Sequence, residues 1–148
     1  MAKTPLDKQI EKARKEAQRN AYKEELRQRA ASIVSSQPII NGVRIIDDTA
    51  ETVLNCLLEN CKDSSTGHVS YDNDIFPQAV SRSIGLEIEK LIQYGMVTSY
   101  IPWANGGMLN LLPCSFSYFE RKATAQAMSL ASTTGEKVDS IIFISHRS

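Results

Sequence analysis

The stretch Ile88-Glu-Lys-Leu-Ile-Gln-Tyr-Gly-Met-Val-Thr-Ser-Tyr-Ile-Pro-Trp-Ala-Asn-Gly-Gly-Met-Leu-Asn-Leu-Leu112 decides the fold. Apolar residues recur at helical spacing up to Gly95, which predicts a helix that ends there in a left-handed glycine cap. Residues 97–103 and 108–112 are rich in strand-forming side chains, and they flank the turn signal Asn105-Gly-Gly107. The sequence therefore predicts a helix followed by a two-stranded hairpin.

Upstream of this stretch, residues 50–60 form an amphipathic run with a predicted buried stripe, and Asp48 or Thr49 is expected to cap it. We expect a polar loop over 62–67, a short strand over 68–71 and a brief helix over 76–80. A helix over residues 81–95 should follow and turn its apolar side inward. Its predicted outward side carries Arg82, Glu87, Glu89, Lys90 and Gln93. The helices over 50–60 and 81–95 each have four predicted inward residues: Val53, Leu54, Leu57 and Leu58 in the first, and Ile84, Ile88, Leu91 and Ile92 in the second.

This order of elements over residues 49–120 resembles the winged helix-turn-helix domains of prokaryotic regulators. Residues 88–97 carry the resemblance, together with Leu111-Leu-Pro-Cys-Ser-Phe-Ser-Tyr-Phe119, which should begin a closing helix with Phe116 and Phe119 in the core. The family often places threonine and glycine at this helix start, and both are missing here. The resemblance implies an α+β, mainly α fold with a winged-helix domain over 39–130.

Residues 1–38 are expected to form a long charged helix and a linker. Helix formers dominate residues 5–32, Thr4-Pro5 with Asp7 is a helix start signal, and Ser35-Ser-Gln-Pro38 ends the helix. A strand-like segment that turns at Asn41-Gly42 should follow. The helix has a thin, alanine-rich apolar face, which suits either self-association or packing on its own domain. The four residues of that face are Leu6, Ile10, Ala13 and Ala17.

The formal net charge of zero hides an asymmetry. Residues 1–44 carry ten Lys or Arg against five Asp or Glu, and residues 45–122 carry the reverse. A basic helix beside an acidic body suits docking between molecules. The same acidic body disfavours binding to duplex DNA, because phosphate binding depends on neutralisation by cations.

The C-terminal residues suggest a second domain. Residues 131–135 are predicted to be a linker, and Val138-Asp-Ser-Ile-Ile-Phe-Ile-Ser-His-Arg-Ser148 is predicted to be an apolar strand. The motif Ile142-Phe-Ile-Ser-His146 resembles the first strand of a Toll/interleukin-1 receptor (TIR) domain. Residues 131–148 would then be a linker and the start of a truncated TIR-like domain. Members of that family cleave NAD or assemble, but their catalytic glutamate lies well downstream of this strand.

No residue pattern indicates catalysis, a metal site or a cofactor. Cys56, Cys61, His68 and Cys114 lack the paired spacing of zinc ligands. We therefore expect a protein that is not an enzyme. An odd number of cysteines fits the cytoplasm, and no apolar run is long enough to span a membrane.

Two main functional hypotheses remain. We favour a non-catalytic winged-helix module that homodimerises through its N-terminal helix and regulates an attached TIR-type effector, in bacterial defence signalling. The alternative is a DNA-binding winged-helix transcriptional regulator, and a weaker third hypothesis is a small-molecule or peptide sensor with a groove beside the wing. The candidate nucleic-acid contacts are Arg82, Lys90, Gln93, Tyr100 and Trp103.

Overall fold

The computed structural model describes residues 4–142, and its N-terminal helix is the longest element (α1, Pro5–Ser35). The predicted start is confirmed, because Asp7 donates its backbone N–H to Thr4 Oγ1 at 3.1 Å and accepts from the Thr4 N–H at 3.3 Å. At the other end, the Arg44 guanidinium donates to the carbonyls of Val34 and Gln37. Since Val34 belongs to the last turn of α1, these contacts tie the end of the helix to Arg44.

A small hairpin and a core helix follow. Strands β1 (Ile39–Ile40) and β2 (Val43–Arg44) pair antiparallel around the predicted turn, where Asn41 and Gly42 have φ of 49° and 82°. Helix α2 (Asp48–Glu59) has Asp47 at its N-cap, one or two residues before the predicted caps Asp48 and Thr49. The Asp47 side chain makes no capping bond, because it binds Lys90 and Tyr94 instead.

The next segment holds strand β3 (His68–Asp72), two 3₁₀ turns (η1, Asn73–Ile75, and η2, Gln78–Val80) and helix α3 (Ile84–Gln93). The brief helix predicted over 76–80 is thus a 3₁₀ turn, preceded by the extended residues Phe76 and Pro77. Gly95 has a φ of 79° directly after α3, which confirms the left-handed cap.

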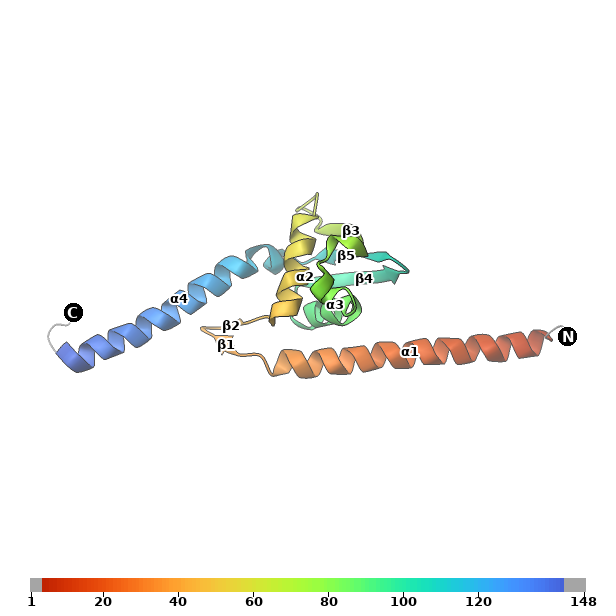
Figure 1. Ribbon diagram of the computed structural model, residues 1–148, viewed down its shortest axis with the longest axis horizontal. Coiled ribbons are helices and arrows are strands. Elements are labelled where there is room, and N and C mark those ends of the chain that lie inside the picture. The colour runs from red at the N-terminus through yellow and green to blue at the C-terminus, as the bar shows by residue number, and fades with distance from the viewer. Residues whose placement is uncertain (1–3, 143–148) are drawn as a thin grey trace.

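Strands β4 (Val97–Trp103) and β5 (Gly106–Leu111) confirm the predicted hairpin, but its turn lies at Ala104 and Asn105 rather than over 105–107, so both glycines belong to β5. The three-stranded antiparallel sheet has the order β3-β5-β4. A side chain on Gly106 would meet the Tyr71 carbonyl oxygen at 2.1 Å, so the close pairing of β5 with β3 needs glycine at this position. Together with α2 and α3, the sheet forms the compact body of the molecule (Figure 1).

The core confirms most of the predicted inward residues. Val53, Leu54, Leu57, Ile88 and Leu91 are all fully buried. Leu58 and Ile92 are half-buried against them.

Where the closing helix begins, the sequence prediction was partly wrong. Tyr118 is fully buried, Phe119 is half-buried and Phe116 is exposed. Tyr118 suits the site because its hydroxyl donates to Glu51 at 2.6 Å and accepts from the Ile46 N–H at 2.8 Å. The aromatic residue with a polar group takes the position where buried polar partners exist.

Helix α4 (Pro113–Ile142) corrects the prediction for the C-terminal residues. It continues through the expected linker at 131–135 and through 138–142, where a strand was expected. A strand needs a neighbour for its backbone hydrogen bonds, whereas a helix satisfies them internally, and no strand within residues 4–142 pairs with this segment. Residues 143–148, the rest of the predicted strand, lie outside the described residues.

The structure is therefore mainly helical with two small antiparallel sheets, as expected for the α+β class. The two long helices project from the body in opposite directions (Figure 1). Within residues 4–142, every helix falls short of the length and hydrophobicity needed to cross a membrane.

Candidate interaction surfaces

The two halves of α1 lie in different environments. The C-terminal half packs along α3, and Ala30 and Val34 are buried there. Gly85 of α3 lies at this contact, where a Cβ would sit 3.7 Å from Leu26 Cδ1, an ordinary van der Waals distance. The N-terminal half extends past the body (Figure 1). Packing on its own domain, one of the two alternatives for this helix, therefore applies to its second half.

The predicted apolar face is exposed along the first half of α1. The exposed fractions of Leu6 and Ile10 are 63% and 56%, and Ala13 and Ala17 are exposed as well. At 3.6 residues per turn, this face points about 130° away from the direction defined by Leu26, Ala30 and Val34. We call these four residues the outer stripe. Because the outer stripe faces away from the body, its own domain cannot cover it.

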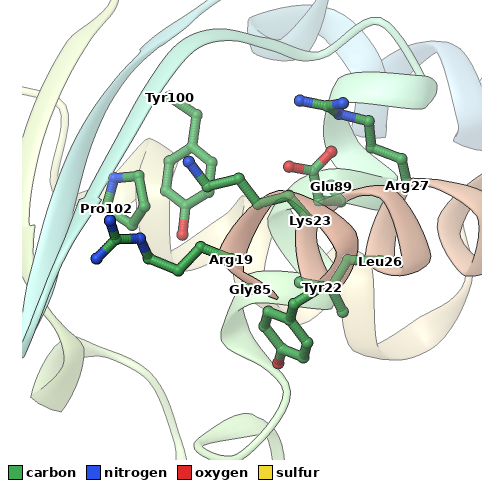
Figure 2. Close-up of a pocket in the computed structure, with 9 residues that line it drawn as sticks. All are labelled: Arg19, Tyr22, Lys23, Leu26, Arg27, Gly85, Glu89, Tyr100 and Pro102. Atoms are coloured by element: carbon green, nitrogen blue, oxygen red, sulfur yellow. The ribbon is translucent and has the colours of Figure 1, made fainter. Parts of the chain in front are cut away.

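A cleft of about 380 Å³ lies where α1, α3 and β4 meet (Figure 2). Helix α1 contributes three cationic residues: Arg19, Lys23 and Arg27. Figure 2 shows Arg19 and Lys23 extending on the side of Pro102 and Tyr100, and Arg27 on the side of Glu89. The other lining residues are Tyr22, Leu26 and Gly85.

The cleft combines an apolar lining with an excess of positive charge. Burial raises the pKa of Glu89, and the charges of Arg27 and Lys23 partly oppose this rise. Burial also raises the pKa of Tyr100, and the Glu89 charge adds to it. Three cations facing one carboxylate can hold an acidic group, while the aromatic and aliphatic side chains accommodate an apolar one. In the sequence, these three cations are spaced four residues apart, which places them on one face of a helix. This spacing is the signal from which the basic side of the cleft could have been predicted.

Lys90, a predicted nucleic-acid contact, is buried instead, and Glu87 beside it was also wrongly expected to face outward. Each residue has an exposed fraction of 3%. The Lys90 ammonium lies 2.6 Å from Asp47 Oδ2 and 2.6 Å from Glu87 Oε1. The Thr49 hydroxyl donates to Glu87 at 2.8 Å, and the Tyr94 hydroxyl donates to Asp47 Oδ1 at 2.6 Å. We call these five residues the Lys90 cluster.

The Lys90 cluster joins the start of α2 to α3. Burial alone would lower the pKa of Lys90, but its hydrogen bonds and ion pairs with Asp47 and Glu87 outweigh burial and raise it. For Asp47, burial would raise the pKa, and the hydrogen bonds from Lys90 and Tyr94 reverse the sign and lower it. Both residues are therefore held in their charged forms, and the role of the cluster is structural.

The lowered pKa of Asp47 predicts a dependence of stability on pH. A carboxylate whose pKa is lower in the folded state stabilises that state above its unfolded pKa of about 4. This contribution is lost as the pH falls through the folded pKa. The difference in unfolding free energy between the wild type and Asp47→Asn should therefore shrink on acidification from pH 7 to pH 3. Urea denaturation at several pH values measures it, and a difference independent of pH would contradict this assignment.

The remaining predicted nucleic-acid contacts do not share one exposed helix surface. Arg82 lies before α3, Gln93 is the single exposed residue within it, and the other nine α3 residues are buried or half-buried. Tyr100 is half-buried in the cleft, whereas Trp103 in β4 is 46% exposed. Because α1 covers one side of α3 and α2 packs on another, α3 presents little surface for reading base edges.

The cysteines take separate positions. Cys56 and Cys61 are half-buried and Cys114 is exposed, and all three are free thiols. Burial raises the pKa of the Cys56 thiol, and the Glu59 charge adds to it. In the described part of the chain, no three His, Cys, Asp or Glu side chains cluster as metal ligands would.

Comparison with models of known protein families, with curated protein sequences and with solved structures gives no match to this chain. The functional argument therefore rests on the residues and their arrangement.

Proposed function

We propose that this chain is a non-catalytic interaction and oligomerisation module with a winged-helix body. It homodimerises through the outer stripe of α1 and controls an effector attached beyond α4. The observation that carries the proposal is the direction of the outer stripe, which faces away from the body. A projecting helix has little stability of its own in water, because helices obtain most of their stability from packing. A partner helix would supply that packing.

The winged-helix part of the proposal is supported by the element order. Helix α2, strand β3, helix α3 and the β4–β5 hairpin follow one another in the order of the family pattern, with the 3₁₀ turn η2 in place of its brief second helix. The DNA-binding alternative is weaker, because α1 and α2 both pack on α3 and leave Gln93 as its exposed residue. The acidic composition of the body weighs in the same direction.

The effector part rests on the sequence motif of residues 142–146, which resembles a TIR segment. Helix α4 leads the chain away from the body, as a rod joining two domains would (Figure 1). The cationic cleft gives a signal a place to act, because an acidic ligand there would contact α1 and the body at once. Such a module suits bacterial defence signalling, in which assembly of the sensor controls the effector.

A matched pair of variants tests the interaction. Ile10→Glu places a charge in the outer stripe, and Gln18→Glu places the same charge on another exposed face of α1. Burying an unpaired carboxylate at a helix contact is unfavourable. Ile10→Glu should therefore raise the dissociation constant of the dimer by about tenfold or more. Gln18→Glu should behave as the wild type. Size-exclusion chromatography with light scattering gives both masses, and equal dimerisation of the two variants would refute this interface.

A further inference from the structure

We infer that two copies of α1 pair antiparallel, with Leu6 of each copy against Ala17 of the other and Ile10 against Ala13. This inference rests on the proposed homodimer and adds its geometry and its consequence. The antiparallel pair places the two bodies at opposite ends of the dimer, so self-association through α1 holds the segments that follow α4 apart.

The spacing of the outer stripe is the first reason. Successive stripe residues are separated by four, three and four positions, so the pattern reads the same in both directions. Reversing one helix therefore places all four residues of one copy opposite the four of the other. The centre of this pairing lies between residues 11 and 12.

The sizes of the side chains favour this direction. In the antiparallel pair, each large residue, Leu6 or Ile10, faces an alanine, which keeps the distance between the helix axes uniform. A parallel pair would place leucine on leucine at one end and alanine on alanine at the other. That arrangement would force the axes apart at the first end and leave a gap at the second. Interiors that alternate large and small residues pack more closely than such a taper.

Charge is consistent with the antiparallel direction. Asp7 and Arg14 lie on the same flank of the outer stripe at helical spacing, and both are exposed. In an antiparallel pair with twofold symmetry, each flank of one helix faces the equivalent flank of the other helix. Arg14 of one copy then lies within about 3 Å, along the axis, of Asp7 of the other. The symmetry produces two such attractive pairs.

The geometry of the monomer permits this arrangement and determines its outcome. The partner helix runs along the side of α1 that faces away from α3, so it meets neither body. At 1.5 Å per residue, the two Ala30 residues, which mark the body contacts, would lie about 55 Å apart along the axis. Helix α4 leaves each body in the direction opposite to the projecting half of α1 (Figure 1), which increases the separation of the C-terminal ends.

The interface is small. Four residues over three turns bury much less than the area of about 1,200–2,000 Å² found in stable complexes. The pair should therefore form in the micromolar range and respond to changes in concentration. A weak contact of this kind is suited to regulation.

Disulfide trapping tests the direction. Leu6→Cys and Ala17→Cys chains are prepared separately and oxidised alone and as a mixture, and the disulfides are assigned by peptide mass mapping. The native Cys56, Cys61 and Cys114 are kept, because mapping separates their products. In the antiparallel pair, two copies of residue 6 lie about 16 Å apart along the axis, beyond the Cα separation of about 7 Å that a disulfide can bridge.

The expected result is a 6–17 disulfide in the mixture and no 6–6 disulfide in the Leu6→Cys chain alone. A 6–6 disulfide without a 6–17 disulfide would overturn the antiparallel direction and leave the homodimer intact. A dimer by mass that forms neither disulfide would also overturn it, because another face would then make the contact. A chain that stays monomeric would instead refute the proposed homodimer itself.

Discussion

Lys90→Met is expected to lower the free energy of unfolding by about 3–5 kcal/mol. The ammonium group lies 2.6 Å from the carboxylates of both Asp47 and Glu87 and has an exposed side-chain fraction of 4%. Methionine fills a similar volume, but it leaves two carboxylates facing each other without a cation between them. Removing one partner of a buried ion pair costs much more than removing an exposed one, because the remaining charge stays desolvated. Urea denaturation followed by circular dichroism measures the loss.

Arg82→Met is the matched control. Arg82 is exposed just before α3, and the same replacement there should change the unfolding free energy by no more than about 0.5 kcal/mol. Adding Glu87→Gln to Lys90→Met should recover part of the loss, since it removes one of the uncompensated charges. Equal effects of Lys90→Met and Arg82→Met would contradict a buried Lys90 cluster.

Gly67→Ala is the second substitution with a large expected effect. Gly67 has a φ of 71°, and a Cβ at this position would lie 2.1 Å from the Leu111 carbonyl oxygen. The Leu111 N–H also donates to the Gly67 carbonyl at 2.7 Å, so the two backbones cannot separate without losing a hydrogen bond. Backbone strain and steric overlap together should cost about 3 kcal/mol or more. Thermal unfolding should show a correspondingly lower midpoint.

Gly95→Ala separates the two causes. Its φ of 79° is almost the same, but a Cβ there meets nothing within 4 Å. Backbone strain alone should cost about 1–2 kcal/mol. If Gly67→Ala and Gly95→Ala lower the stability equally, the close approach of the Gly67 loop to β5 is wrong.

The sequence was sufficient to predict the body because local signals agreed with one another there. The apolar period changes from helical to strand-like at Gly95, and the Asn-Gly-Gly signal indicates a hairpin, whose turn lies at Ala104 and Asn105. The Thr4 cap was predicted for the same reason, since a capping box depends on neighbouring residues alone. These features need no information about distant parts of the chain.

The Lys90 cluster could not be predicted in this way. Asp47 and Thr49 are about 40 residues from Glu87 and Lys90 in sequence, and a charged residue on a helix is usually solvated. The cleft could not be predicted for the same reason, because α1, α3 and β4, which are distant in sequence, meet to form it. The helix over 138–142 was not predicted for a different reason. Apolar β-branched residues favour a strand only where another strand can pair with them, and the sequence does not show whether one is present.

Sedimentation equilibrium of the wild-type chain, at concentrations from low to high micromolar, tests the central claim most directly. The single chain has a mass of 16.4 kDa. If the outer stripe mediates homodimerisation, the weight-average mass should rise with concentration from that value towards twice that value, and the data should fit a monomer–dimer equilibrium. A mass that remains at 16.4 kDa up to several hundred micromolar would contradict the account.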